Sequence, residues 1–199
     1  MNFHYFQHPH KFSTYTGEEQ YCDLCKQVRP GYKGPFYGRE RIEFVCEECL
    51  VHGRLADVGV TMNEGDVASL RRQLEDMRPD FGQEQIQELV QQRTAELEYR
   101  TPHVVTWQDF RWPAHCGDYC RFIKEVGKPE LNQLAPDANG QGFFAEHLRE
   151  EYRSTTNIPD VWGAIRPDSP EDNSIAYSVG VYLFQCLLCQ EHVILWDCD

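Results

Sequence analysis

Four cysteines near the start of the chain have the spacing of a structural zinc site. They form two pairs, Cys22/Cys25 and Cys46/Cys49, with twenty residues between the pairs. A two-residue gap folds into a tight turn, here called a knuckle, that places both sulfurs about 2.3 Å from one tetrahedral ion. Two knuckles complete the coordination sphere and leave no position for a reactive water. The spacing predicts structural Zn²⁺, with an iron–sulfur cluster or redox thiols as alternatives.

Two further cysteine pairs predict a second zinc site. Cys116 and Cys120 are four residues apart, so on a helix they point from the same face. Cys186 and Cys189 form another knuckle between two β-rich runs. A second Zn²⁺ would tie the helical middle of the chain to its C-terminal hairpin. The alternative is that these four are small buried core residues, because free cysteine is among the most buried residue types.

Three neighbouring residues are not expected to bind the metal directly. His115 would project about 100° away from Cys116 on a helix, so it is expected to lie beside the metal rather than on it. His52 follows Cys49 by three residues and is interpreted as a surface or neighbouring histidine. Cys198 has no close partner in the sequence and is interpreted as a spare thiol.

Cysteine usage and hydropathy together predict a cytoplasmic protein. Eight of the nine cysteines fall into close pairs, and the first residues, Met1–Tyr5, lack the basic start and apolar core of a signal peptide. Close pairing without a secretion signal favours metal over disulfides, because cytosolic thiols stay reduced. No apolar run approaches the roughly 20 residues that span a bilayer, so no membrane contact is expected.

The charge is unevenly distributed. Residues 1–54 hold seven basic and seven acidic residues, so residues 55–199 carry the whole net charge of −13. An acidic surface repels phosphate backbones and accelerates encounters with basic partners. Direct nucleic-acid binding is therefore not expected, although the charge taken alone is better explained by solubility than by a basic partner.

The elements that position these residues indicate an α+β protein. Residues 1–54 are predicted to form a loop-and-strand module that is too small to fold without a stabilising metal ion. Residues 55–199 are predicted to form an acidic α+β region. Helices are expected over 63–77, with Asn63 as the cap, and over about 83–100. The apolar stripe of the second helix, formed by Ile86, Leu89, Val90 and Leu97, is interrupted by Arg93.

The rest of the chain is expected to contain two helices and a hairpin. The helices are placed at 113–126 and 143–153, with loops over 127–142 and 157–173. The two β-rich runs 176–185 and 192–196 predict a C-terminal β-hairpin with the last cysteine pair in its turn.

No motif names a reaction. The chain has no GxSxG, Walker loop, HExxH or GxGxxG, and none of its CxxC pairs follows a proline as in zinc deaminases. A four-thiolate site also gives zinc no open position for an activated water. The prediction is a protein that is not an enzyme.

Several short signatures occur in one order along nearly the whole chain. They include Phe3 to Pro9, the two N-terminal CxxC pairs with Gly34-Pro35-Phe36-Tyr37 between them, Gly53, Arg100-Thr101-Pro102, Trp107-Gln108, Trp112, His115-Cys116-Gly117-Asp118 with Cys120, and Tyr182-Leu183-Phe184 before the last CxxC. The set resembles the bacterial CbrC-like family, which is named for a colicin-tolerance protein. One departure is Gln190, where a glycine is usual after the last CxxC.

The resemblance implies a cysteine-rich protein of tolerance to a nuclease colicin, and genes of such proteins beside toxin genes suggest an immunity role. Together with the acidic charge, it predicts a protein that binds and neutralises a basic toxin domain, a nuclease. The contact surface is predicted from acidic residues near one loop and one short helix: Glu146, Glu150, Glu151, Asp168, Glu171 and Asp172.

Two other functions remain open at this point. A pocket lined by His103, Trp107, Trp112 and His115 would favour an enzyme or stress-response factor with a small-molecule target. A surface stripe formed by the lysines and arginines of residues 1–54 would favour a zinc-ribbon adaptor in regulation.

Overall fold

The computed structural model describes residues 2–170 and 177–199. Helices and short strands occur in mixed order, which confirms the predicted α+β class. The chain divides into two compact units. Unit 1 comprises residues up to Val105, Phe110–Arg121 and Cys186–Cys189; unit 2 comprises Thr106–Asp109, Phe122–Gln185 and Gln190–Asp199. The predicted boundary between residues 54 and 55 concerns independent folding and stays a prediction.

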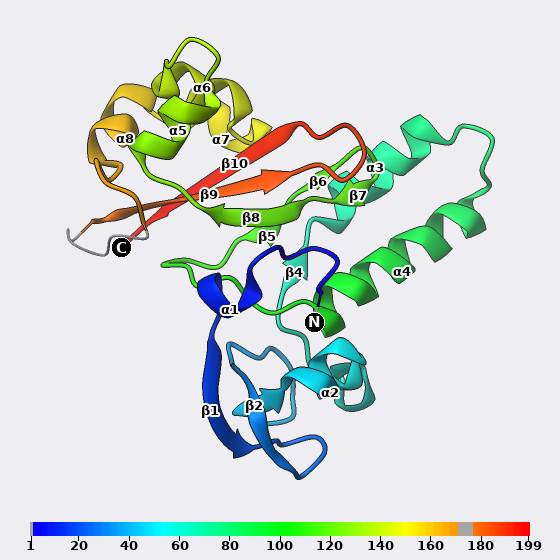
Figure 1. Ribbon diagram of the computed structural model, residues 1–199. Helices are drawn as coiled ribbons and strands as arrows, with labels where there is room; N and C mark the ends of the chain where they lie inside the picture. Colours follow the sequence, from blue (N-terminus) through cyan, green and yellow to red (C-terminus); the bar gives the residue numbers. More distant parts are fainter. Residues whose placement is uncertain (1, 171–176) are drawn as a thin grey trace. The chain divides into compact units, whose positions relative to one another are not determined.

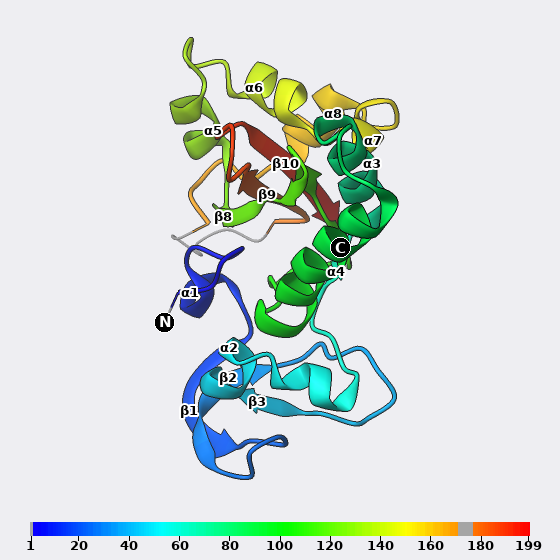
Figure 2. The ribbon, with the colours of Figure 1, turned by 90° about the vertical axis from the view of Figure 1, so that its right-hand side faces the viewer.

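Unit 1 begins with an antiparallel sheet of three strands (Figures 1 and 2). The strands are β1 (Tyr15–Tyr21), β2 (Val28–Lys33) and β3 (Phe44–Cys46), and β3 leads directly into α2 (Glu47–Val51). Gly31 pairs with Cys46, and a Cβ at this position would collide with the Val45 carbonyl. Glycine therefore lets β3 approach β2 closely enough to place Cys46 directly beside Gly31.

The helical part of unit 1 is a pair of helices, α3 (Val67–Met77) and α4 (Gln83–Arg100), as the sequence predicted. The predicted cap of α3 was wrong: Asp66 caps the helix by accepting a hydrogen bond from Ser69 N at 3.0 Å. Asn63 is instead buried and donates to the Thr101 carbonyl at 2.7 Å, so it holds the end of α4. The remaining elements of unit 1 are short: α1 (Pro9–Phe12), the 3₁₀ helix η1 (Arg54–Val58), β4 (Glu64–Gly65) and β5 (Arg111–Trp112).

The helix predicted over residues 113–126 is absent from this described segment. Its place is taken by three strands, β6 (Ala114–His115), β7 (Asp118–Tyr119) and β8 (Arg121–Glu125). β6 and β7 form a hairpin whose two turn residues, Cys116 and Gly117, have φ of 52° and 72°. Positive φ at both positions is what a two-residue type I′ turn requires. The glycine inside the expected helix was the signal of this turn.

Unit 2 consists of a sheet with helices on one face (Figures 1 and 2). The strand order is β10-β9-β8, and β9 (Val179–Gln185) pairs antiparallel with β10 (His192–Cys198), which confirms the predicted C-terminal hairpin. The helices are α5 (Lys128–Leu134), α6 (Gly140–His147), α7 (Glu150–Arg153) and α8 (Ile158–Ala164). The sequence had predicted loops where α5 and α8 lie.

The core of unit 2 lies between that sheet face and the helices. Alternate residues of β9, Val179, Val181 and Leu183, point into it, as the period of a strand requires. Phe143 and Phe144 of α6 pack against them in the same cluster. Among the described residues, no helix combines the length and the apolar character that crossing a bilayer needs.

Candidate metal centres

Site 1 is the group formed by the first two cysteine pairs, and the structure brings all four sulfurs together. The ligand atoms of Cys22, Cys25, Cys46 and Cys49 lie within 4.8 Å of one another. The Sγ atoms of Cys25 and Cys46 are 3.7 Å apart. Sulfurs about 2.3 Å from a tetrahedral ion are separated by about 3.8 Å, so this spacing fits zinc. Cys22, Cys46 and Cys49 are buried and Cys25 is half-buried.

The first knuckle is a tight turn between β1 and β2. Cys22 N donates to the Gln27 carbonyl at 2.8 Å, and Lys26 N donates to the Cys22 carbonyl at 2.9 Å. Lys26 takes a left-handed conformation with φ of 61°. These bonds turn the chain sharply enough for Cys22 and Cys25 to face the same point.

Asp23, between the two cysteines of that knuckle, fastens it to the strand that carries the second pair. Its Oδ2 accepts from Glu43 N at 2.8 Å and from Phe44 N at 3.0 Å. Its backbone N donates to the Phe44 carbonyl at 3.0 Å. Cys46 N then donates to the Cys22 sulfur at 3.3 Å. These hydrogen bonds therefore bring the two cysteine pairs to one point.

The electrostatics of site 1 favour the thiolate form of Cys22. Burial opposes ionisation of Cys22, but N–H groups of Cys25, Cys46 and Leu24 lower the pKa of its thiol to about 7. Burial raises the pKa of Cys49, and Arg54 Nη1 lies 3.9 Å from its sulfur. Four thiolates around one divalent ion carry excess negative charge, and this guanidinium offsets part of it.

Site 2 is a mixed group of three cysteines and one histidine. The ligand atoms of His115, Cys116, Cys186 and Cys189 lie within 4.8 Å of one another, and all four residues belong to unit 1. His115 Nδ1 is 3.4 Å from the Cys189 sulfur. The Cys186 sulfur accepts from Leu188 N at 3.4 Å, a bond that closes this knuckle. Cys186 is buried, whereas Cys189 is exposed.

The structure places His115, and not Cys120, in this group. On the expected helix Cys116 and Cys120 would share a face, but the type I′ turn instead presents the adjacent residues His115 and Cys116 together. Cys120 is buried beside the group, and burial with the nearby Cys186 and Cys189 raises its pKa well above the usual range. Its carbonyl accepts from Trp112 Nε1 at 2.7 Å, which fixes its backbone under the hairpin.

The remaining cysteine and histidine of the sequence analysis lie outside both groups. Cys198 is half-buried at the end of β10, where Gln108 Nε2 lies 3.9 Å from its sulfur. His52 is exposed at the end of α2, and its Nδ1 lies 2.7 Å from the Glu48 carbonyl.

The four residues of the alternative pocket have different surroundings. Trp112 is buried in unit 1, and Trp107 is exposed in unit 2. His103 Nδ1 lies 3.0 Å from the Met62 carbonyl, while His115 belongs to site 2.

The predicted acidic contact residues fall into three classes. Glu146, Glu150 and Glu151 are exposed in unit 2. Asp168 is largely buried and accepts two hydrogen bonds from the buried Arg166, at 2.9 and 3.1 Å. Glu171 and Asp172 lie outside the described residues.

The whole chain matches one family model. Residues 1–198 match the uncharacterised protein family UPF0167. The chain belongs to UPF0167. UPF0167 proteins of Mycobacterium bovis and Mycobacterium tuberculosis are each 30% identical to it, over 98% of this chain and 91% of theirs. A UPF0167 protein of Pseudomonas aeruginosa is 25% identical, over 94% of this chain and 91% of its own.

No solved structure matches the chain. The names of the three relatives above carry no functional description, and the CbrC-like name rests on the motif resemblance alone. What membership of UPF0167 and the geometry establish together is a member of an uncharacterised family with two cysteine-rich groups that could hold metal ions.

Proposed function

We propose that this UPF0167 protein is a zinc-stapled binding protein in which both cysteine-rich groups hold structural Zn²⁺. The observation that carries the proposal is the convergence of the four site 1 sulfurs at a separation suited to a tetrahedral ion. Each group supplies four donors, so an ion bound to all of them has no open position for a water or substrate. Zinc in these sites would order the chain and would not carry out a reaction.

Metal analysis of protein purified without chelator tests this proposal. We expect two zinc ions per chain by native mass spectrometry and elemental analysis. Cys46→Ser should lose one ion and Cys189→Ser should lose the other, because each removes one of four ligands. Cys198→Ser is the matched control, since this cysteine lies in neither group, and it should keep both ions. Wild-type protein without bound metal, or with iron in place of zinc, would contradict the proposal.

A second pair of variants tests the ligands of site 2. His115→Ala should release the site 2 ion, whereas Cys120→Ser should retain it. The cadmium-substituted protein gives an independent readout, because its ¹¹³Cd chemical shift distinguishes three sulfur ligands and one nitrogen from four sulfurs. The reverse pattern would assign the ion to the four cysteines of the original prediction.

The partner that we propose for this scaffold is a basic toxin domain, a nuclease, met in the cytoplasm. Two observations support it: the net charge of −13 carried by residues 55–199, and the motif resemblance to a colicin-tolerance family. Nuclease toxins bind polyanions, so a strongly acidic protein is complementary to them. A blocking protein of this kind needs no catalytic residues.

Association kinetics with the toxin domain encoded beside its gene test the partner. Binding should be fast at low salt, and the association rate should fall by about 10-fold or more as ionic strength rises to about 0.15 M. Replacing Glu146, Glu150 and Glu151 together by glutamine should slow association. Glu84→Gln with Glu88→Gln, two exposed changes on α4, is the control. If the protein neither binds this toxin nor protects cells that express it, the immunity proposal is wrong, and zinc binding is unaffected.

A further inference from the structure

Arg93 is a charged residue on the core-facing side of α4, and neither metal site explains it. Its neighbours on that side, Ile86, Val90 and Leu97, are buried. The Arg93 side chain is 25% exposed, and its Nε lies 3.8 Å from Asp118 Oδ1. A mostly buried guanidinium needs a counter-charge, which Asp118 supplies. That contact engages Nε and leaves the terminal nitrogens Nη1 and Nη2 without a partner among the described residues.

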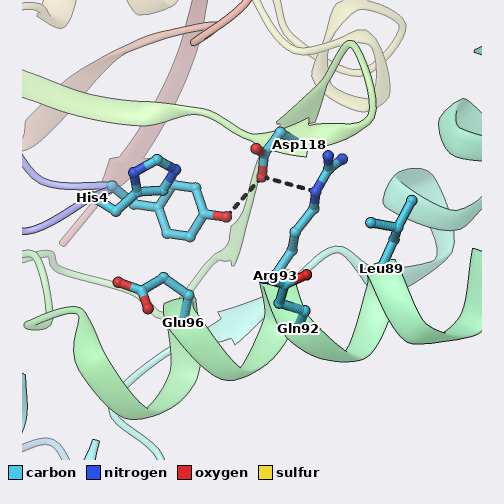
Figure 3. Close-up of a pocket in the computed structure, with 7 residues that line it drawn as sticks. His4, Leu89, Gln92, Arg93, Glu96 and Asp118 are labelled. Atoms are coloured by element: carbon cyan, nitrogen blue, oxygen red, sulfur yellow. Dashed lines mark hydrogen bonds and ion pairs between the residues drawn. The ribbon is translucent and has the colours of Figure 1, made fainter. Parts of the chain in front are cut away.

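Asp118 is held rigidly, so it fixes the direction of Arg93. Its Oδ1 accepts from the Tyr5 hydroxyl at 2.7 Å and from Tyr119 N at 2.8 Å. Burial, and then the Asp118 carboxylate, hold the pKa of Tyr5 above its usual range, so the phenol remains a donor. Figure 3 shows the contact between Asp118 and Arg93, and the same Asp118 oxygen accepts the hydrogen bond from Tyr5.

These residues border a cavity of about 430 Å³ that lies within unit 1. Cavities of roughly 300–1,000 Å³ are typical of small-molecule sites. Figure 3 shows Glu96 one turn along α4 from Arg93, on the side of His4. Residues three apart on a helix have Cβ atoms about 5–6 Å apart. The wall formed by α4 therefore presents a cation and an anion close together.

We propose that this cavity binds a small zwitterion, a free α-amino acid. The terminal nitrogens of Arg93 offer paired donors that match a carboxylate, and Glu96 offers an acceptor for an ammonium group. Gln92, which directly precedes Arg93, also lines the cavity and can hydrogen-bond to either group, while Leu89 offers an apolar contact to a side chain.

The charges that line the cavity favour an amino acid over a phosphate or a plain cation. Two carboxylates, Glu96 and Asp118, line the cavity together with Arg93, and this disfavours a phosphate dianion. A plain cation would leave the Arg93 donors without an acceptor. Glu96 also pairs with Arg100, whose Nη1 lies 3.7 Å from Glu96 Oε2, and this leaves Oε1 for a ligand.

Isothermal titration calorimetry of the full-length protein with each of the standard L-amino acids tests the proposal. We expect saturable binding of at least one, with a Kd below about 10 mM. The N-acetyl derivative, which lacks the ammonium group, and the α-amide, which lacks the carboxylate, should each bind at least about 10-fold more weakly. Arg93→Gln should weaken the parent amino acid by a similar factor and leave the α-amide unchanged. Glu96→Gln should leave the N-acetyl derivative unchanged.

Arg71→Gln on α3 is the matched control, because it removes the same charge at a position that does not line this cavity. Unchanged circular dichroism and melting temperature of Arg93→Gln would show that the fold is kept, and Arg93→Lys provides a milder variant if it is not. The proposal fails if none of the amino acids binds. It also fails if inorganic phosphate binds as tightly as the best amino acid, or if Arg93→Gln and Arg71→Gln have equal effects.

Discussion

The N-terminal sheet of unit 1 and the core of unit 2 differ in the features that can stabilise them. Unit 2 has one apolar cluster of twelve buried residues between a sheet face and its helices, including Phe144, Leu183 and Ile194. Unit 1 contains both cysteine-rich groups, and its N-terminal sheet has three strands of which β3 is only three residues long. A small sheet buries little apolar surface, so the metal ion proposed for site 1 is expected to stabilise this one.

In unit 2, a buried carboxylate of the last strand adds to the pairing of that strand with β9. Asp197 of β10 is buried, and its Oδ2 accepts from Trp107 N at 2.8 Å and Gln108 N at 2.9 Å. Its Oδ1 accepts from the Tyr182 hydroxyl at 2.9 Å. The comparison teaches that the stability of unit 1 should depend on metal, and that of unit 2 on packing and buried hydrogen bonds.

The largest effect is expected from Cys46→Ser, which would separate the two units in stability. Structural zinc contributes on the order of 10–16 kcal/mol of apparent binding free energy in small domains, and little of it survives the loss of one buried ligand. Hydrogen exchange should show loss of protection in β2 and β3 but retained protection in β9. Uniform loss of protection across both units would mean that they do not differ in this way. Cys198→Ser should resemble the wild type.

The converse change is Phe144→Ala in the apolar cluster of unit 2. Phe144 is fully buried, so its truncation should lower the free energy of unfolding by about 3–5 kcal/mol, measured by urea titration. Zinc content under native conditions should stay at two ions per chain. Tyr21→Ala removes an aromatic ring that is 55% exposed and should change the stability little, which makes it the control.

A third experiment compares the two metal sites within unit 1. Cys189 of site 2 is exposed, whereas three of the four site 1 cysteines are buried. A chelator should therefore remove the site 2 ion faster, by about 10-fold, or roughly 1.4 kcal/mol in activation free energy. A stopped-flow assay with a chromogenic chelator should show two phases. Cys189→Ser should remove the fast phase, and loss of the slow phase instead would reverse the order.

The smallest effect concerns Glu98, a carboxyl of unit 1 outside the metal sites. Burial, and then the nearby Glu64, raise its pKa to about 7 from 4.5. Between pH 4.5 and about pH 7, the folded protein holds a proton on Glu98 that the unfolded chain has released. The stability that protonated Glu98 contributes is therefore lost as pH rises through about 7. Glu98→Gln should gain about 1 kcal/mol on the wild type between pH 5 and pH 8. Glu88→Gln, an exposed change, should gain nothing.

The sequence was most informative where structure is local. A CxxC knuckle is formed by neighbouring residues, so its spacing predicted the grouping of Cys22, Cys25, Cys46 and Cys49. The C-terminal hairpin and the pair α3 and α4 were likewise legible from periodicity. As metal ligands, all of these cysteines remain predictions until zinc is measured.

The sequence-based prediction was wrong where the expected helix over one segment determined the side-chain directions inferred from it. Taking residues 113–126 as a helix paired Cys116 with Cys120 and turned His115 away. The type I′ turn at Cys116-Gly117 reverses both conclusions. The cavity beside Arg93 was not predictable either, because Tyr5 and Asp118, which both line it, are separated by 113 positions in the chain. Only the interruption of the α4 stripe by Arg93 hinted at it.

Each CxxC knuckle between two strands is followed by a residue whose backbone conformation favours glycine. Lys26 follows Cys25 with φ of 61°, and Gln190 follows Cys189 with φ of 65°. A side chain in the left-handed region costs roughly 1–2 kcal/mol, partly offset because glycine has more entropy to lose on folding. Replacing these two residues by glycine should therefore give a more stable variant, and it leaves every cysteine in place. The natural chain has no glycine at either position. Selection has therefore not maximised the stability of these knuckles.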